Sequence, residues 1–512
     1  MRTNLLDRAI LWLSPERGAA RIEARARASV AARRATMLES VYDGATHSYR
    51  NSSRRYRPGD ANSTLIHAAR RLRFAARDLE RNNPIAQRGF SVLTSNVIGA
   101  GIVPSVTTPR GGNRSLTALQ QLLKSHCDTP KIDAAGRQNL YGLQTVAFRA
   151  AVRDGESLMV RRLALASEGL PLPFQVAVLE ADYIDDRVNG VQPNGNLAVQ
   201  GIEFDRKGEA VTYHLYDHHP GDLTIYTALN SRPYPAADVV HLYRIDRPGQ
   251  ARGVSWIAPV IVRLGDFEDT KEAYVMRQKI AACFAAFITK VDAAGNPVDQ
   301  ETTPNGSPIE TVEPGMIEHL GPGESVTFGT PPVVGDLEAF FRVNARDIAV
   351  GLGMTYEALT GDLSNVNFSS GRMGWLEFHR NIGAWTWQMV LPQMCSKLGQ
   401  WLLDGLMLMA VVPTGATIEW TPPRREMIDP ASELKAAAQA ARDGLGTRSM
   451  WLRGMGYDPE TIDTDRATEL QREATLGLLY DTNTSAEVAA KVRTAPQPTP
   501  EQTAPNSQEV DQ

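Results

Sequence analysis

Four histidines and one aspartate form the group of side chains best suited to metal chemistry: His214, His218, His219, Asp222 and His241. Imidazole and carboxylate groups are common zinc ligands, so this group could serve a metal-dependent hydrolase. Its spacing follows no fixed ligand pattern, however, and no general base stands beside it. The alternative is a structural strand and turn, with the adjacent histidines in a loop between strands. We favour that alternative and predict no metal site and no cofactor.

Common active-site signatures are missing from the rest of the sequence. It contains no phosphate-binding P-loop, no H-E-x-x-H pair and no G-x-S-x-G elbow. The simplest arguments for an ATPase, a zinc protease or a serine hydrolase therefore fail. We expect a protein that is not an enzyme.

A polar loop between two predicted helices is the second candidate site. Residues 355–367 are rich in Gly, Asp, Ser and Asn, which suit turns rather than a core. Helical spacing of apolar residues continues after the loop over 369–410, and Ser369 or Ser370 can cap that helix. Pro392 should kink the helix without ending it. On these residues alone, an ordinary surface loop is the alternative.

A helix predicted over 335–353 precedes the polar loop. One of its faces carries acidic and basic residues, and the other is apolar, so the helix should have a wet side and a buried side. The apolar face should comprise Leu337, Phe340, Phe341, Ala345, Ile348, Ala349 and Leu352.

The elements before these sites indicate a mixed α+β protein. Helical spacing predicts helices over 64–80, 85–97, 115–127 and 141–154, with a break at Asn82, Asn83 and Pro84. Alternation of apolar and polar residues then predicts an antiparallel sheet with one wet face. Its strands are expected over 157–165, 174–179, 201–204 and 211–215, and one more strand is expected later in the chain, over 416–420.

The later segments suggest an assembly rather than a compact enzyme. A helix predicted over 255–288 would be about 50 Å long, which suits a strut. Residues 290–334 hold few apolar side chains, so a small β-module there needs to pack against copies of itself. Residues 429–480 are helical by pattern, with caps at Asp429, Thr447 and Asp458.

Charge is distributed unevenly along the 512 residues, whose net charge is −4. Residues 1–90 contain eighteen Arg, no Lys and eight acidic residues. Such a basic region is typical of contact with phosphate, a membrane surface or an acidic partner, and solvated arginine-rich helices are the alternative. A monomeric DNA-binding module that uses this region is therefore a second rival function.

Three widely spaced cysteines form no disulfide framework, which fits a reducing cytoplasm. The first residues do not form a signal peptide, and no stretch of about twenty apolar residues exists to cross a membrane. We therefore expect no membrane contact.

Several motifs carry a resemblance to one family. Residues 77–84 (RDLERNNP) and 96–102 (NVIGAGI) resemble the opening motif of lambda-type bacteriophage portal proteins. Residues 239–243 (VVHLY) with 247–253 (RPGQARG) are similar to a second motif of that family. Residues 361–372 (GDLSNVNFSSGR) resemble the motif that joins the two channel helices. These motifs occur in the expected order over roughly residues 60–480.

The resemblance implies a portal fold of the α+β class that forms a ring, typically of twelve subunits, with long stem and tunnel helices, an α/β wing, a small β-rich clip and a helical crown. The corresponding division is a partly disordered basic N-terminal arm (1–57), wing (58–254), first stem helix (255–289), clip (290–334), second stem helix (335–353), tunnel loop (354–368), tunnel helix (369–410), wing return strand (411–428), crown (429–480) and disordered tail (481–512).

The resemblance also implies a function as the conduit for double-stranded DNA at one capsid vertex. The DNA-facing residues of the tunnel loop would be Asp362, Ser364, Asn365, Val366, Asn367, Phe368 and Arg372. The candidates on the stem that face the channel would be Lys271, Arg277, Lys279, Arg342 and Arg346. The uncharged Asn and Ser side chains at the tip of the loop suit this role, because they would bind DNA phosphates only weakly. Tight phosphate binding would stop the DNA from moving through the channel.

The implied partners are other copies of the chain and the machinery of a phage head. They comprise the terminase large subunit during packaging, the major capsid protein and scaffold, and later the head–tail connector or adaptor protein. The implied location is the virion, at the portal vertex of the capsid, after assembly in the host cytoplasm.

Overall fold

The computed structural model describes residues 59–107, 113–222, 229–282, 286–290, 324–328, 337–423, 429–457 and 459–478, together with residues 16, 224 and 427. The expected N-terminal arm, the C-terminal tail and most of the expected clip lie outside these ranges. Among the described helices, none has the length and apolar character that a membrane span requires.

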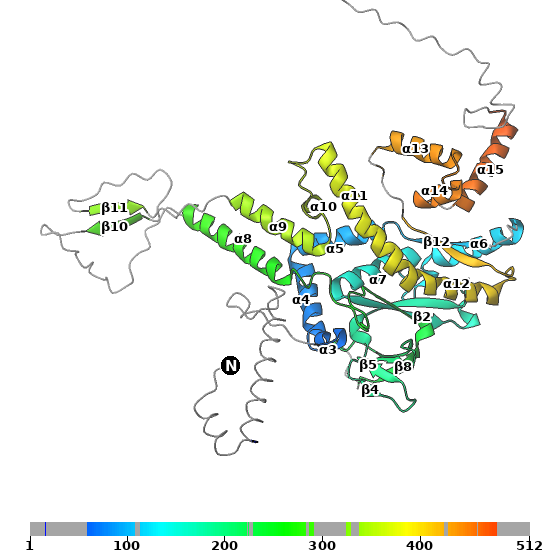
Figure 1. The fold of residues 1–512 in the computed structure, drawn as a ribbon, viewed down its shortest axis with the longest axis horizontal. Coiled ribbons are helices and arrows are strands. Elements are labelled where there is room, and N and C mark those ends of the chain that lie inside the picture. The colour runs from blue at the N-terminus through cyan, green and yellow to red at the C-terminus, as the bar shows by residue number, and fades with distance from the viewer. Residues whose placement is uncertain are drawn as a thin grey trace, which may run out of the picture. The chain divides into compact units, whose positions relative to one another are not determined.

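The single helix predicted over 64–80 is two helices in the structure, separated by a turn at residues 66–68, while the other early helices lie where they were predicted (Figure 1). The early helices are α3 (Ala61–Leu65), α4 (Ala69–Asn82), α5 (Pro84–Val97), α6 (Asn113–Cys127) and α7 (Leu140–Asp154). Asn83 separates α4 from α5, and its side-chain oxygen accepts hydrogen bonds from the N–H groups of Ile85 and Ala86, both at 3.0 Å. With Pro84 at the first helical position, this is a strong start signal, and the predicted break is confirmed.

The strands form two main antiparallel sheets rather than one. The three-stranded sheet has the order β3 (Phe174–Glu180), β2 (Glu156–Leu163) and β9 (Val239–Tyr243). The five-stranded sheet has the order β4 (Gly190–Val191), β5 (Leu197–Val199), β6 (Ile202–Phe204), β7 (Ala210–Tyr216) and β8 (Ser231–Pro235).

The expected single wet face is wrong for the three-stranded sheet, because β2 is buried on both sides. Leu158 and Val160 belong to a small core shared with the five-stranded sheet. Met159, which points the opposite way, belongs to the large core beneath the helices. The sheet therefore separates two apolar cores, and a strand in that position carries a nearly continuous apolar run.

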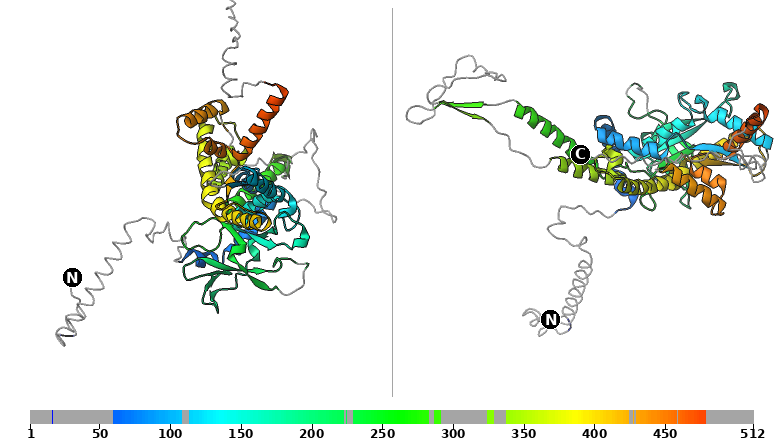
Figure 2. Two further views of the ribbon diagram at one scale, coloured as in Figure 1. Left: turned by 90° about the vertical axis from the view of Figure 1, so that its right-hand side faces the viewer. Right: turned by 90° about the horizontal axis from the view of Figure 1, so that it is seen from above.

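The helices predicted over 255–288 and 335–353 correspond to α8 (Ile261–Ala282) and α9 (Leu337–Leu352), which lie side by side (Figures 1 and 2). The 22 residues of α8 span about 33 Å, so the predicted length was too great. Ser255 to Val260 lie outside the helix, and Ala286–Lys290 form strand β10, paired with β11 (Glu324–Phe328). The aromatic and β-branched residues Phe287, Ile288 and Thr289 suit a strand, and pairing with β11 decides in its favour.

The apolar face of α9 is only partly buried in the single chain. Ala345, Ile348, Ala349 and Leu352 lie in the core, whereas the side chain of Phe340 is 49% exposed. The prediction that Phe340 would be buried is therefore wrong for the isolated chain, since the end of α9 near Leu337 extends past the packed core.

The polar loop contains a short helix that the sequence prediction missed, α10 (Tyr356–Thr360). The chain then continues as α11 (Phe368–Trp385), a π-helical segment (Thr386–Cys395) and α12 (Ser396–Met409). Pro392 lies within the π-helical segment, so the prediction that it would not end the helix is confirmed. The wider winding includes a bond from the N–H of Ser396 to the carbonyl of Leu391, five residues back.

Within the described residues, a further strand pair joins the early part of the chain to a late strand, and more helices follow it. Strand β12 (Thr417–Thr421) was predicted, but its antiparallel partner β1 (Val103–Thr107) was not. The last helices are α13 (Pro430–Arg442), α14 (Arg448–Gly454) and α15 (Pro459–Leu476). Asp429 and Thr447 accept N-cap hydrogen bonds as predicted.

Candidate functional site: a buried ion network and an exposed polar loop

The carboxylate of Glu156, at the start of β2, is fully buried. It accepts hydrogen bonds from Nε of Arg252 at 2.9 Å and Nη2 at 2.5 Å, and from the N–H of Gly253 at 2.9 Å. Nη1 of Arg73 lies 3.5 Å away. Burial alone would raise the pKa of Glu156, but Arg252 and the hydrogen bond from His241 outweigh it and hold the pKa well below its usual range.

His241 is the histidine partner of this carboxylate. Its Nε2 lies 3.0 Å from Glu156, and its Nδ1 lies 3.4 Å from the hydroxyl of Tyr213. Burial lowers the pKa of His241, although the adjacent carboxylate opposes that effect. The ionised Glu156 can only accept, so a neutral His241 donates a hydrogen bond from Nε2 and accepts one at Nδ1 from the Tyr213 hydroxyl.

A second group of ion pairs joins α4 to α7. Nη2 of Arg77 lies 2.8 Å from Asp154 and 2.5 Å from Asp182. Nε of Arg153 lies 2.7 Å from the same Asp154 carboxylate. Although burial opposes it, the hydrogen bond with Asp154 raises the pKa of Arg77 above its usual range. Both arginines therefore stay charged.

These groups form one set, which we call the ion network. Each of its charges has an opposite charge beside it, as a buried charge requires. Its members are Arg73, Glu80, Arg77, Arg149, Arg153, Asp154, Glu156, Glu180, Asp182, His241 and Arg252.

Two glycines allow the backbone to approach closely at the network. A Cβ on Gly253 would lie 2.0 Å from the carbonyl oxygen of Gly155. Gly155 has a φ of +97° and ends α7, so it also needs the left-handed conformation. This contact brings the Gly253 N–H and Arg252 to Glu156.

The predicted histidine cluster does not converge on one point. His214 lies 2.7 Å from Glu203, and His241 lies at Glu156 in the other sheet. His218 and Asp222 are exposed. The loop-between-strands interpretation fits this arrangement, and the metal-dependent hydrolase finds no support in it.

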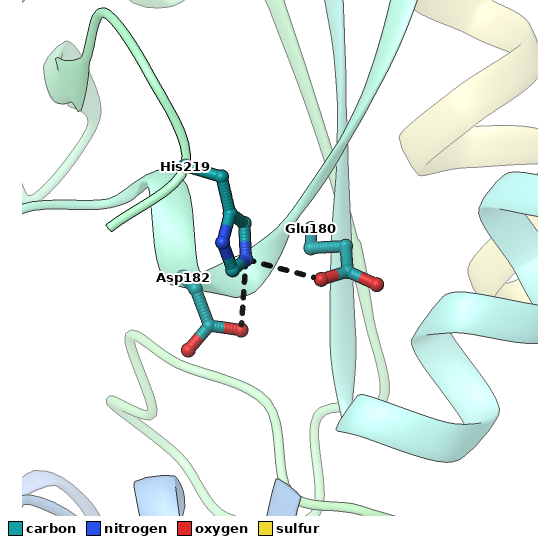
Figure 3. A group of neighbouring side chains, drawn as sticks. All are labelled: Glu180, Asp182 and His219. Carbon is teal, nitrogen blue, oxygen red and sulfur yellow. Dashed lines mark ion pairs between the residues drawn. The ribbon is translucent and has the colours of Figure 1, made fainter. Parts of the chain in front are cut away.

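One potential cation-binding group does exist among the described residues, and it uses one of those histidines. Nε2 of His219 lies 3.2 Å from Glu180 and 4.0 Å from Asp182 (Figure 3). However, Nη2 of Arg77 lies 3.1 Å from the same Glu180 oxygen and 2.5 Å from the same Asp182 oxygen. A cation would have to displace that guanidinium, so these carboxylates serve the ion network.

The polar loop differs from the network in being exposed and locally bonded. Oδ1 of Asp362 accepts from the N–H of Ser364 at 3.0 Å and from its hydroxyl at 2.6 Å, while Oδ2 accepts from Tyr356 at 3.0 Å. These bonds, with the Ser364 hydroxyl first, lower the pKa of Asp362. Asn365 is exposed at the turn.

The cap of α11 is Asn367 rather than Ser369 or Ser370. Its side-chain oxygen accepts from the N–H of Ser370 at 2.8 Å, and the Ser370 hydroxyl is 3.2 Å from the N–H of Asn367. This reciprocal arrangement is a capping box. Asn367 therefore has a structural task as well as an exposed position.

Apolar side chains accompany the polar ones in this loop. Phe368 is 67% exposed and Leu363 is 65% exposed. Together with Val366, Arg372 and Trp375 they line a cavity of about 350 Å³. Large exposed apolar groups beside a polar turn are typical of a contact surface.

The five basic stem candidates are placed on α8 and α9, and most already interact within the chain. Nζ of Lys271 lies 4.3 Å from the ring centre of Phe267. The guanidinium of Arg346 lies 5.6 Å from the ring centre of Tyr356. Arg342 pairs with Glu338. Arg277 is half-buried and Lys279 is exposed.

The ion network was not predicted from the sequence, although two of the portal-like motifs supply parts of it. Residues 77–84 provide Arg77 and Glu80, and residues 239–253 provide His241, Arg252 and Gly253. Glu156, an acidic residue at the start of an apolar strand, indicates a buried carboxylate but does not identify its partners.

Comparison with known families identifies the protein. A family model described as "Phage portal protein, lambda family" matches residues 47–386. The class is therefore that of phage portal proteins, which are components of the virion. Within that class, the chain belongs to the lambda family.

Individual proteins that resemble this chain share only a low sequence identity with it. The "Probable portal protein" of Halomonas phage phiHAP-1 (isolate -/Gulf of Mexico/-/2001) is 27% identical over 447 residues, which cover 82% of this chain and 84% of the relative. The solved neck of a native GTA particle, computed with C12 symmetry, shows 16% identity and a TM-score of 0.44 over 75% of this chain and 94% of that chain. An HK97 family portal protein from Corynebacterium diphtheriae shows 11% identity and a TM-score of 0.34 over 71% and 98%.

Proposed function

We propose that copies of this chain form a ring, of twelve subunits as is typical for the family, through which double-stranded DNA enters and leaves a phage head. The membership in the portal family carries this proposal. In the ring, the polar loop between α9 and α11 points into the bore. The chain acts as a structural conduit and not as an enzyme.

The exposure of the polar loop supports its place in the bore. Asn365 and Ser364 are exposed and uncharged at the tip, and Asp362 is already engaged by Ser364 and Tyr356. A surface of this kind offers the phosphate backbone weak contacts without sequence preference. Val366, Asn367, Phe368 and Arg372 complete the proposed DNA-facing set.

The pair α8 and α9 acts as the stem in this proposal. Lys279 and Arg277 on α8, and Arg342 and Arg346 on α9, are the basic residues that would face the channel, with Lys271 nearer the core. The strand pair β10–β11 belongs to the clip, and α13–α15 to the crown. The clip docks the terminase large subunit during packaging and the head–tail connector afterwards, while the wing meets capsid protein and scaffold.

Negative-stain imaging of the purified full-length chain tests the ring. We expect rings with a central hole. A second measurement places the loop: Asn365→Cys in the ring should resist a maleimide-modified protein too large to enter the bore, yet react with a small maleimide. Rings whose position 365 reacts equally with both reagents would put the loop on the outer wall and end the proposal.

A further inference from the structure

A cleft of about 570 Å³ opens between elements that are distant in the sequence. The turn between α5 and β1 contributes Gly99, and α11 with the π-helical segment contributes Trp375 and Trp387. The end of β12 contributes Thr421 and Pro423. No Asp, Glu, Lys or Arg is found among the described residues that line it.

Two side chains that line this cleft lack the packing or hydrogen bonding expected of them within the described chain. The side chain of Trp387 is 62% exposed at its rim. Thr421 is only 2% exposed, and its hydroxyl has no hydrogen-bond partner among the described residues. Buried hydroxyls are normally paired, and exposed Trp is typical of a binding hot spot. A cleft with Trp and Pro walls and, among its described lining residues, no Asp, Glu, Lys or Arg is the type of surface that binds proline-rich segments.

The same chain carries a segment of that chemistry. Residues 494–500 read TAPQPTP, with prolines at 496, 498 and 500, and none of these seven residues is charged. Alternate prolines favour the extended polyproline conformation, which loses little entropy on binding. We propose that the cleft binds residues 496–500 of its own chain, with Trp387 packed on the prolines and a polar group of the segment paired with Thr421.

The length of intervening chain permits this contact. Residues 479–495 lie between the last described helix and the segment, and seventeen residues can span about 55 Å. The 18 residues of α15 span about 27 Å. Because α15 packs on α14 and Gly456 after α14 lines the cleft, the linker is long enough to return along α15. The bound segment would fasten α14 and α15 to the rest of the fold.

Fluorescence of a labelled full-length chain tests the inference. Cys127 and Cys395 are buried, so Thr499→Cys in a Cys283→Ser background can carry a bimane label, which contact with Trp quenches. We expect quenching at 499 and loss of quenching after Trp387→Phe, or after replacing the three prolines by Ala. The matched control is the same label on Ser507→Cys, which should stay bright. Equal brightness at 499 and 507, or no response to Trp387→Phe, would overturn the inference.

A mixing experiment separates the chain's own segment from that of a neighbour. Labelled chains that carry Trp387→Phe are refolded with an excess of unlabelled wild-type chains. We expect the label to stay bright, because its own cleft lacks the quencher. Restored quenching would assign the cleft to a neighbouring copy and overturn the own-chain contact.

Discussion

The ion network and the polar loop are both rich in charged and amide side chains, but they satisfy them in opposite ways. Glu156 is fully buried, and its partners come from residues up to 97 positions away. Asp362 is bonded to residues within six positions and belongs to an exposed turn. The ion network therefore holds distant elements together. The bonds of the polar loop shape only that one segment and do not link it to the rest of the fold.

The comparison teaches that family motifs do not share one physical role. Residues 77–84 and 247–253 bring arginines into the interior, where removal of one partner leaves an uncompensated charge. Residues 361–372 form a turn and a cap, where each interaction contributes little to stability. Substitutions in the two regions should therefore differ in size, and that difference can be measured.

The largest effect is expected from Glu156→Gln. The amide keeps the shape of the side chain but leaves Arg252 buried without its paired carboxylate, and Arg73 keeps only Asp182. We expect a loss of about 3–5 kcal/mol in the free energy of unfolding, measured by urea denaturation. The matched control is Asp347→Asn, which removes an exposed ion pair with Arg263 and should cost less than about 1 kcal/mol. Equal losses in the two variants would contradict the contrast.

Stability should also fall as the solution becomes acidic, and His241 should be one cause beside His126, whose pKa burial lowers to about 4. The folded-state pKa of His241 is lowered, so between that value and about 6.5 the unfolded chain binds more protons than the folded one. The stability is therefore fully present above about pH 6.5 and decreases below it, by at most about 1.4 kcal/mol per pH unit for each histidine. Glu156, whose folded pKa is also lowered, adds a further loss below about pH 4.5.

Thermal unfolding at pH 7.5 and pH 5.5 checks this prediction. His241→Gln keeps a donor toward Glu156 but cannot titrate, so its midpoint should change less between the two pH values than that of the natural chain. His67→Gln, at an exposed position, should leave the pH dependence unaltered. A His241→Gln variant with the full pH dependence would assign the effect to another group.

Local signals explain which elements the sequence could predict. The break at Asn83 and Pro84 and the caps at Asp429 and Thr447 depend on neighbours within three residues, and all were found. The π-helical form at Pro392 and the end of α8 were not predictable, because packing and strand pairing decide them. Periodicity finds a helix or strand but does not reveal which distant element covers it.

The ion network was invisible for the same reason. Arg252 and Glu156 are 96 positions apart, and no pattern within either segment identifies the other as its partner. The polar loop, in contrast, could be predicted as a turn from Gly361, Asp362 and Asn367 alone. The cap of the helix after the loop was predicted at Ser369 or Ser370, two or three residues after the true cap Asn367. Ser and Asn both serve as N-caps, and only the hydrogen-bond geometry distinguishes them.

The smallest effect separates two asparagines within the polar loop. Asn367→Ala removes the N-cap of α11 and should cost about 1 kcal/mol, with faster amide hydrogen exchange at Ser370 in the first turn of the helix. Asn365→Ala, two residues away at the exposed tip, should change the free energy of unfolding by less than about 0.5 kcal/mol. If Asn365→Ala nevertheless slows DNA packaging while Asn367→Ser, which keeps a cap, does not, the tip acts on the DNA and the cap acts only on the helix. The reverse result would assign the contact with DNA to position 367.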